Sequence, residues 1–292
     1  IPAITAFAID SLGLHASTNY TRLHDTGGSP ISWNVSASPP DSFTPYLWNF
    51  PFIGALPYKG FFTQNRAIAE RRHLEQLGYD AIDRPVPAYS TLGYFSDPIL
   101  STMLNYSAAR LADLVLHELT HATIFASGNT DFNESLATFI GREGSLLFLA
   151  HHYGVDTPLI IQAQEARADQ KIFAGFMRQV TSALDSLYNS DLERSAILAQ
   201  RHQVYAVAKE GFHRIQPQFK RLNYDGFLSW ELNNARLLSY RRYNRDLSLF
   251  AQVFDSRQGN MRLTLEVFSA CSSAREPWAC LSKAIQSQPV PQ

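Results

Sequence analysis

Two histidines and a glutamate within five residues are the most specific chemical signal in this chain. His117, Glu118 and His121 form the pattern His-Glu-x-x-His. Residues four apart share one face of an α-helix, about 6 Å apart, so the two imidazoles can bind one metal ion. Glu118 points elsewhere on the helix, where its carboxylate can act as a base on the open side of the metal. The pattern predicts a catalytic site for one zinc ion.

A catalytic zinc site needs a third protein ligand and an open fourth position for water. Glu134 is the candidate, because it begins the pattern Glu-x-x-Ala at the start of a second expected helix. Glu134 also lies three residues after Asp131, so it could instead complete a capping box. His117 and His121 could be ordinary histidines beside a core. The combination of the two motifs favours the metal site.

Two helices joined by a short turn are expected to hold these residues. Residues 108–125 contain strong helix formers, and Gly128 then provides a stop signal. The second helix is expected over residues 132–147 or beyond, with Asp131 as its N-cap. Antiparallel packing of the two helices would bring Glu134 back to the histidines.

The rest of the pattern predicts an α+β protein. Residues 31–35 alternate like a strand, and residues 46–62 combine aromatic residues with Pro and Gly, which is typical of short strands and tight turns. We expect a single unit, residues 1–292, with a sheet-containing N-terminal lobe over residues 1–107 and a predominantly helical lobe over residues 108–292. Helical spacing is found in four further segments, residues 63–77, 158–187, 192–213 and 227–254.

Composition restricts the class of protein. The chain has 292 residues, of which 45% are hydrophobic, as expected for a globular protein with a substantial core. The formal net charge of −1 gives no electrostatic reason to expect nucleic acid or an anionic membrane as a partner. No apolar run approaches the length of a transmembrane segment.

Residues 117–121 (H-E-L-T-H) and 132–137 (F-N-E-S-L-A) resemble the gluzincin metallopeptidases, the thermolysin-like branch with a glutamate as third zinc ligand. More narrowly, the chain resembles a family of bacterial zinc aminopeptidases, often lipoproteins. The resemblance implies a zincin-like fold, a peptide substrate and a periplasmic or membrane-anchored extracytoplasmic location. It also implies a removed export or lipoprotein signal, which leaves room for a lipid anchor. Further matching segments are residues 33–35, 50–54, 58–62, 88–95, 97–98 and 233–235.

An edge strand over the metal is a feature that the gluzincin resemblance implies for the small mixed sheet. Pro85 and Pro87 suit an edge strand better than a central one, and an edge strand can hold an extended peptide by backbone hydrogen bonds. The alternative is an ordinary strand whose tyrosine packs in the core. The residues assigned to substrate binding on this strand are Ala88, Tyr89, Ser90 and Thr91.

The resemblance also places a tyrosine after the Asn-Asn-Ala segment. Tyr240 and Tyr243 are therefore the candidates for stabilising the carbonyl oxygen during catalysis, and core packing is the alternative for each. Asn233 and Asn234 are candidates for capturing the α-ammonium group of a substrate.

Residues around the ligands complete the predicted site. Thermolysin-like enzymes often carry an acid one turn after the glutamate ligand, but this chain has Thr138 there. Asp113, one turn before His117, is a candidate substitute for orienting an imidazole. Asn133, next to Glu134, is likewise a candidate for supporting the metal ligands.

The leading hypothesis is zinc-dependent peptide-bond hydrolysis. Glu118 would accept a proton from a zinc-bound water and pass it to the leaving amine. Aminopeptidase activity is what the resemblance implies, and an endopeptidase with the same mechanism is the first alternative. A catalytically silent zinc-binding regulatory protein on a peptidase fold is the second, although an intact Glu118 argues against it. A non-peptide amidohydrolase is a further option.

Cys271 and Cys280 are the two cysteines. Their spacing does not fit a metal site with the histidines. A local disulfide is expected if the protein is exported, and two free thiols are the alternative.

Overall fold

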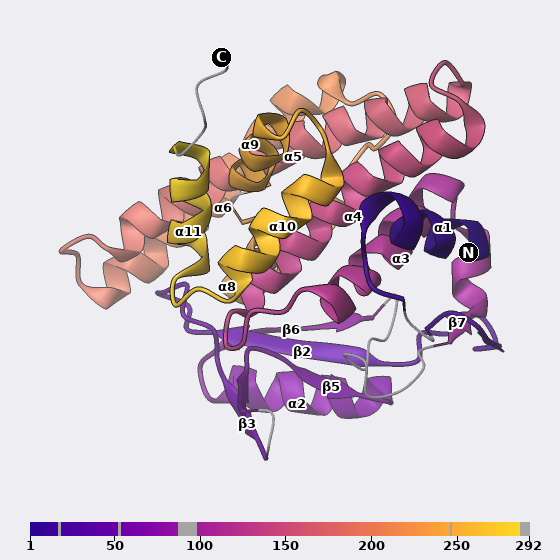
Figure 1. Ribbon diagram of the computed structural model, residues 1–292. Coiled ribbons are helices and arrows are strands. Elements are labelled where there is room, and N and C mark those ends of the chain that lie inside the picture. Colours follow the sequence, from indigo (N-terminus) through magenta and orange to yellow (C-terminus); the bar gives the residue numbers. More distant parts are fainter. Residues whose placement is uncertain (17–18, 52–53, 87–97, 246, 287–292) are drawn as a thin grey trace. The chain divides into compact units, whose positions relative to one another are not determined.

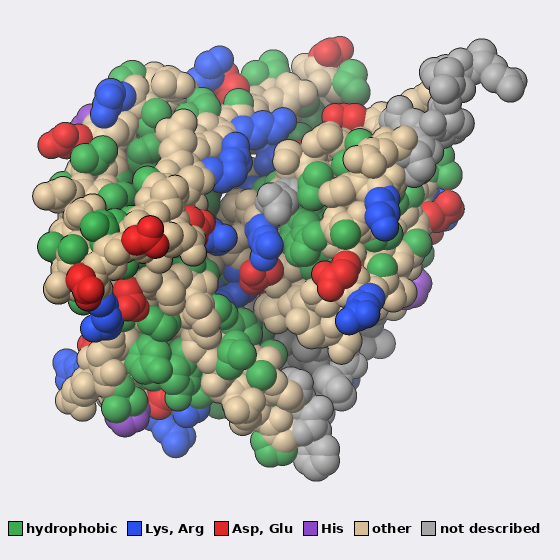
Figure 2. Space-filling view, turned by 90° about the vertical axis from the view of Figure 1, so that its left-hand side faces the viewer, with side chains coloured by type: hydrophobic (Ala, Val, Ile, Leu, Met, Phe, Trp, Pro, Cys, Tyr) green, Lys and Arg blue, Asp and Glu red, His purple; other side chains and the backbone are tan. Residues whose placement is uncertain are grey.

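The computed structural model describes residues 1–16, 19–51, 54–86, 98–245 and 247–286 (Figure 1). It is mainly helical with small sheets, which confirms the α+β class. No helix in these ranges is long and apolar enough to cross a membrane. On the face shown in Figure 2, acidic and basic side chains are interspersed, in keeping with the net charge of −1.

The chain forms two compact units, and each is discontinuous in sequence. Unit 1 contains Ile1–Pro30, Pro87–Ile160 and Arg241–Gln292, and unit 2 contains Ile31–Val86 and Ile161–Tyr240. These boundaries differ from the expected lobes at residues 1–107 and 108–292, because the helical segments are shared between both units. The two-lobe description stays a prediction.

Helices α3 (Ala108–Thr123) and α4 (Thr130–Tyr153) form the centre of unit 1. Buried Ala112, Val115, Leu116 and Leu119 follow the i, i+3, i+4, i+7 spacing of one helix face. The chain turns between the helices at Gly128, whose φ of +74° favours glycine. The paired-helix prediction is therefore confirmed.

The predicted N-cap of α4 is wrong. The helix begins at Thr130, Asn129 occupies the N-cap position, and no side chain caps it. Asp131 instead lies in the first turn, where its carboxylate is 3.6 Å from the Arg245 guanidinium. The Asp131 carboxylate therefore pairs with Arg245, which is distant in sequence, instead of capping the helix.

The C-terminal helices of unit 1 pack beside α4. They are α9 (Leu247–Ser256), α10 (Met261–Ser272) and α11 (Pro277–Gln286). Cys271 and Cys280 form a disulfide between α10 and α11, which confirms that prediction. The smaller elements of the unit are α1 (Pro2–Phe7), the π-helix η1 (Ala8–Leu12), β1 (Leu23–His24), β7 (Ile99–Leu100) and the 3₁₀ helix η2 (Ser101–Asn105); β1 and β7 pair in parallel.

Unit 2 contains a three-stranded sheet with β2 (Trp33–Ser38) between β5 (Lys59–Phe61) and β6 (Asp80–Pro85). Both pairings are antiparallel, so the described strands of this sheet are not the mixed arrangement expected from the sequence. Helix α2 (Gln64–Gln76) covers one face (Figure 1). A separate hairpin pairs β3 (Trp48–Phe50) with β4 (Gly54–Leu56).

The helices of unit 2 enclose an aromatic core. Helix α5 (Pro158–Tyr188) starts in unit 1 and continues into unit 2, where it accompanies α6 (Arg194–Ile215), η3 (Gln216–Gln218) and α7 (Gly226–Ser229). Helix α8 (Asn234–Asn244) leads back into unit 1. The stretch expected to be helical over residues 227–254 is thus divided into α7, α8 and α9. The buried aromatic residues of the core are Phe173, Phe176, Tyr205, Phe212 and Phe227.

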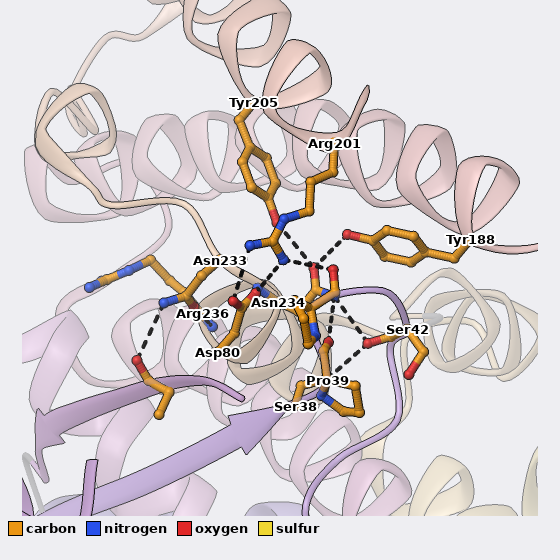
Figure 3. A network of polar contacts seen from close by, with 12 residues as sticks. Ser38, Pro39, Ser42, Asp80, Tyr188, Arg201, Tyr205, Asn233, Asn234 and Arg236 are labelled. Carbon is orange, nitrogen blue, oxygen red and sulfur yellow. Dashed lines mark hydrogen bonds and ion pairs between the residues drawn. The ribbon is translucent and has the colours of Figure 1, made fainter. Parts of the chain in front are cut away.

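A buried asparagine ties the sheet of unit 2 to its helices (Figure 3). The Asn234 amide donates to the carbonyl oxygens of Pro39 and Ser42, at 2.9 and 3.1 Å. Its Oδ1 accepts from the hydroxyls of Tyr188 and Tyr205, at 2.7 and 3.1 Å. Burial raises the pKa of Tyr205, so this hydroxyl keeps its proton and stays a donor.

An ion pair adjoins this amide. Arg201 contacts both carboxylate oxygens of Asp80, at 2.8 and 3.2 Å, and Asp80 also accepts the backbone N–H of Asn234 at 2.7 Å. The Arg201 and Asp80 side chains are 11% and 12% exposed. Both charges therefore depend on partners within the protein, because removing either would leave the other buried without its counter-charge.

Replacing Asn234 with alanine is expected to lower the free energy of unfolding by about 3–5 kcal/mol, because two hydroxyls and two carbonyls lose their buried partner. Chemical denaturation would measure this. Asn233→Ala is the matched control, since Asn233 accepts the backbone N–H of Arg236 in the first turn of α8 and its loss should cost about 1 kcal/mol. Equal losses in the two variants would contradict this account.

Candidate metal centre

Three side chains of α3 and α4 converge on one point. His117 Nε2 and His121 Nε2 lie 3.2 Å apart. Glu134 Oε2 lies 3.5 Å from the first and 3.7 Å from the second. These residues form a cluster with the composition of a metal site. Antiparallel packing of α3 and α4 thus brings Glu134 back to the histidine pair.

The separations match a zinc ligand set. Bonds of about 2.0–2.2 Å at tetrahedral angles place neighbouring ligand atoms about 3.4 Å apart. A direct charge-assisted hydrogen bond would be shorter, at about 2.7–2.9 Å. The three atoms therefore lie at the spacing expected around a shared ion, and the side chains fit a metal better than a simple ion pair.

Burial and charge favour the ligand form of Glu134. Burial alone would raise the pKa of its carboxyl group, but the adjacent imidazoles of His117 and His121 outweigh this and hold the pKa well below its usual range. Burial would likewise lower the pKa of His117, and Glu134, Glu118 and Asp113 more than reverse it. Excess negative charge thus surrounds the imidazole pair, as a cation site requires.

Glu118, the residue after His117, has a buried carboxylate oxygen. Its Oε2 is buried and has no hydrogen-bond partner in the part of the chain that the structure describes. His121 Nδ1 is in the same situation. Burying a carboxylate oxygen without a partner is unfavourable, so such an atom is a candidate for contact with a bound water, ion or substrate.

Gly141 allows α3 and α4 to approach closely at this site. A Cβ added at Gly141 would lie 2.6 Å from the backbone oxygen of Asp113 and 3.3 Å from His117 Cβ, and would also collide with Asp113 Oδ1. The Asp113 carboxylate therefore lies in the helix interface next to His117. That Asp113 orients the imidazole of His117 stays a prediction.

Comparison with known proteins also points to a peptidase. A family model described as "Putative aminopeptidase" matches residues 1–276. The chain belongs to this aminopeptidase family. No curated protein and no solved structure matches it.

Two further residues expected to support the ligands in this aminopeptidase family member lie on α4. Asn133 Oδ1 accepts from the backbone N–H of Ala126 at 2.8 Å, and its amide donates to the Ala126 oxygen at 2.9 Å. Asn133 therefore fixes the turn that leads into α4 rather than orienting an imidazole. Thr138 is buried one turn after Glu134.

The two candidate tyrosines of α8 fall in different units. The ring of Tyr243 lies 6.2 Å from the ring of His117, centroid to centroid. The hydroxyl of Ser135, next to Glu134, donates to the backbone oxygen of Arg242 at 3.0 Å. This bond fixes Arg242, the residue directly before Tyr243. Tyr240 belongs to unit 2, where its ring packs edge-on against Phe173 at 5.6 Å. Of the two tyrosines, Tyr243 is the one with a contact at the metal cluster.

The predicted substrate-binding residues lie elsewhere. Ala88, Tyr89, Ser90 and Thr91 fall outside the described residues. Asn233 and Asn234 belong to unit 2, and their side-chain groups bond to the protein itself. Those bonds give both asparagines a structural position.

Sequence reasoning missed Gly141 and the two arginines near Asp131. Arg242 Nε and Arg245 lie 3.9 and 3.6 Å from the Asp131 carboxylate. Gly141 carried a usable signal, because a glycine inside a helix costs about 1 kcal/mol and usually has a packing reason. The arginine contacts join residues more than a hundred positions apart and left no local signal.

Gly141→Ala is expected to lower the free energy of unfolding by about 1–3 kcal/mol and to weaken zinc binding, because the added methyl group forces α3 and α4 apart. Denaturation and a zinc titration with a competing chelator would measure the two effects. Gly175→Ala in α5 is the control, since its Cβ would meet an Arg178 nitrogen at an ordinary 3.7 Å. Unchanged zinc affinity in Gly141→Ala would refute the interface role.

Proposed function

We propose that this member of the aminopeptidase family is a zinc-dependent peptidase of the gluzincin type. The observation that carries the proposal is the convergence of His117, His121 and Glu134 at tetrahedral spacing. In addition, the buried Oε2 of Glu118, the residue after His117, has no hydrogen-bond partner among the described residues. Two imidazoles and one carboxylate form a catalytic rather than a structural zinc set, because three protein ligands leave the fourth position to water or substrate.

Zinc bound at these three residues would acidify a water molecule and polarise the scissile carbonyl. Glu118 would take the proton from the attacking water and deliver it to the leaving amine. The Tyr243 hydroxyl would donate a hydrogen bond to the carbonyl oxygen as negative charge develops there. Support for Tyr243 comes from its ring lying beside His117.

The family description favours cleavage at the N-terminus of a peptide, and a zincin-like arrangement around α3 and α4 is part of the proposal. An endopeptidase with the same chemistry is the alternative. We also propose an extracytoplasmic location. The disulfide between Cys271 and Cys280 supports it, because such bonds persist in oxidising compartments.

Glu118→Gln is expected to retain one zinc ion per chain and to reduce peptide hydrolysis by at least about a hundredfold, because the amide cannot accept the water's proton. Metal analysis after dialysis and an assay of peptide cleavage would test both parts. Glu134→Ala is the companion variant: it removes a ligand and should lose zinc as well as activity.

Two outcomes would count against the mechanism. Activity retained by Glu118→Gln would remove its general base, and zinc retained by Glu134→Ala after dialysis would remove its third ligand. A wild-type protein that holds zinc fully but cleaves no member of a broad peptide library would favour the catalytically silent alternative.

An aminopeptidase should hydrolyse aminoacyl p-nitroanilides and unblocked peptides, and N-acetylation of the same peptides should abolish cleavage, because the enzyme must recognise a free α-ammonium group. Mass spectrometry of the products would show removal of single N-terminal residues. Glu118→Gln serves as the control for contaminating peptidases. Internal cleavage of N-acetylated peptides would establish an endopeptidase instead.

A further inference from the structure

We propose that the disulfide-linked pair α10–α11 positions the third metal ligand, Glu134, and that Trp278 is the residue through which it acts. This role rests on the proposed zinc site, whose ligands lie on α3 and α4, and extends it to α10 and α11. It assigns Trp278 as a positioning residue and gives the Cys271–Cys280 disulfide a role in metal binding.

The first turn of α4 needs support from outside the helix. Glu134 lies directly after this turn, and no side chain caps the helix at Asn129. Uncapped first turns leave backbone N–H groups unsatisfied and tend to fray. Fraying here would displace the Glu134 carboxylate from His117 and His121. Tertiary packing against the first turn therefore bears directly on the ligand.

Trp278 supplies part of that packing. Phe132, in the first turn of α4, is fully buried, and its ring lies 5.3 Å from the ring of Trp278 and 5.5 Å from that of Phe250. Residues 132 and 134 are two apart, about 200° around the helix, so Phe132 faces the aromatic cluster while Glu134 faces α3. Removing Trp278 would loosen the back of the turn that carries the ligand.

The disulfide fixes the position of α11. Cys280 lies two residues after Trp278, and its partner Cys271 is buried at the end of α10. Helix α10 is itself held against α4 by Phe268, whose ring lies 5.9 Å from Phe139. The bond thus connects Trp278 covalently to a helix that packs on the same face of α4 as Phe132.

A second contact joins Trp278 to this turn. The Arg245 guanidinium lies 5.4 Å from the Trp278 ring centroid, within cation–π distance. The same guanidinium is 3.6 Å from the carboxylate of Asp131. Trp278 therefore reaches the first turn of α4 both through an apolar ring and through a charged side chain.

The test is the zinc affinity of variants, measured by competition with a chelator well below their unfolding temperatures. Trp278→Ala should weaken zinc binding by about tenfold, the range seen when residues behind metal ligands are lost. Trp278→Phe keeps an aromatic ring against Phe132 and should restore most of the affinity. The double variant Cys271→Ser, Cys280→Ser leaves every ring in place and should weaken binding in the same direction.

The control is Leu184→Ala, which removes a buried side chain from unit 2 and should lower thermal stability without changing zinc affinity. Co²⁺ substitution adds a second readout, since a displaced carboxylate alters the visible absorption bands of the bound ion. Wild-type zinc affinity in Trp278→Ala would overturn the positioning role. If Trp278→Ala does not fold, wild-type affinity in the double cysteine variant overturns it. Zinc retained by Glu134→Ala would instead overturn the proposed site.

Discussion

The close contact between α3 and α4 at Gly141 is the constraint on which the metal centre depends. Neither helix carries the complete set of proposed ligands: α3 supplies His117 and His121, and α4 supplies Glu134. The three ligand atoms reach spacings of 3.2–3.7 Å only because the helices are near enough for the Asp113 backbone to fill the space of a missing side chain. Small changes in helix separation would therefore act on metal geometry before they disrupted the fold.

Helix α4 has to satisfy two neighbours at once. Its metal-facing side presents Glu134 and Gly141 to α3, while Phe132 and Phe139 pack against the aromatic residues of α9, α10 and α11. An apolar back fixes the rotation of the helix about its axis, and this rotation decides where the carboxylate points. Glu134 stays ionised despite its burial, because the adjacent imidazoles of His117 and His121 hold the pKa of its carboxyl group below its usual range.

Much of this arrangement was accessible from the sequence, because the metal motif and the helix periodicity are local. His117, Glu118 and His121 are identified by spacing alone, and the apolar stripe of α3 follows the helical period. The Asp131 cap failed for the opposite reason. A local rule assigned its carboxylate to the helix end, whereas Arg245, distant in sequence, lies close to it in the fold. Asn234 was likewise assigned to substrate binding from the sequence, whereas in the fold its side chain makes four hydrogen bonds within the protein.

Tyr243 shows how a distant element can complete a local motif. Nothing in the periodicity of α8 separates Tyr240 from Tyr243, yet one ring lies in the aromatic core of unit 2 and the other beside His117. The deciding contact is the bond from Ser135 to the Arg242 backbone oxygen, which joins residues 107 positions apart. Because Ser135 follows Glu134, the same turn of α4 that provides the proposed metal ligand also holds the segment that carries Tyr243. The positions of Glu134 and Tyr243 therefore depend on the same turn of α4.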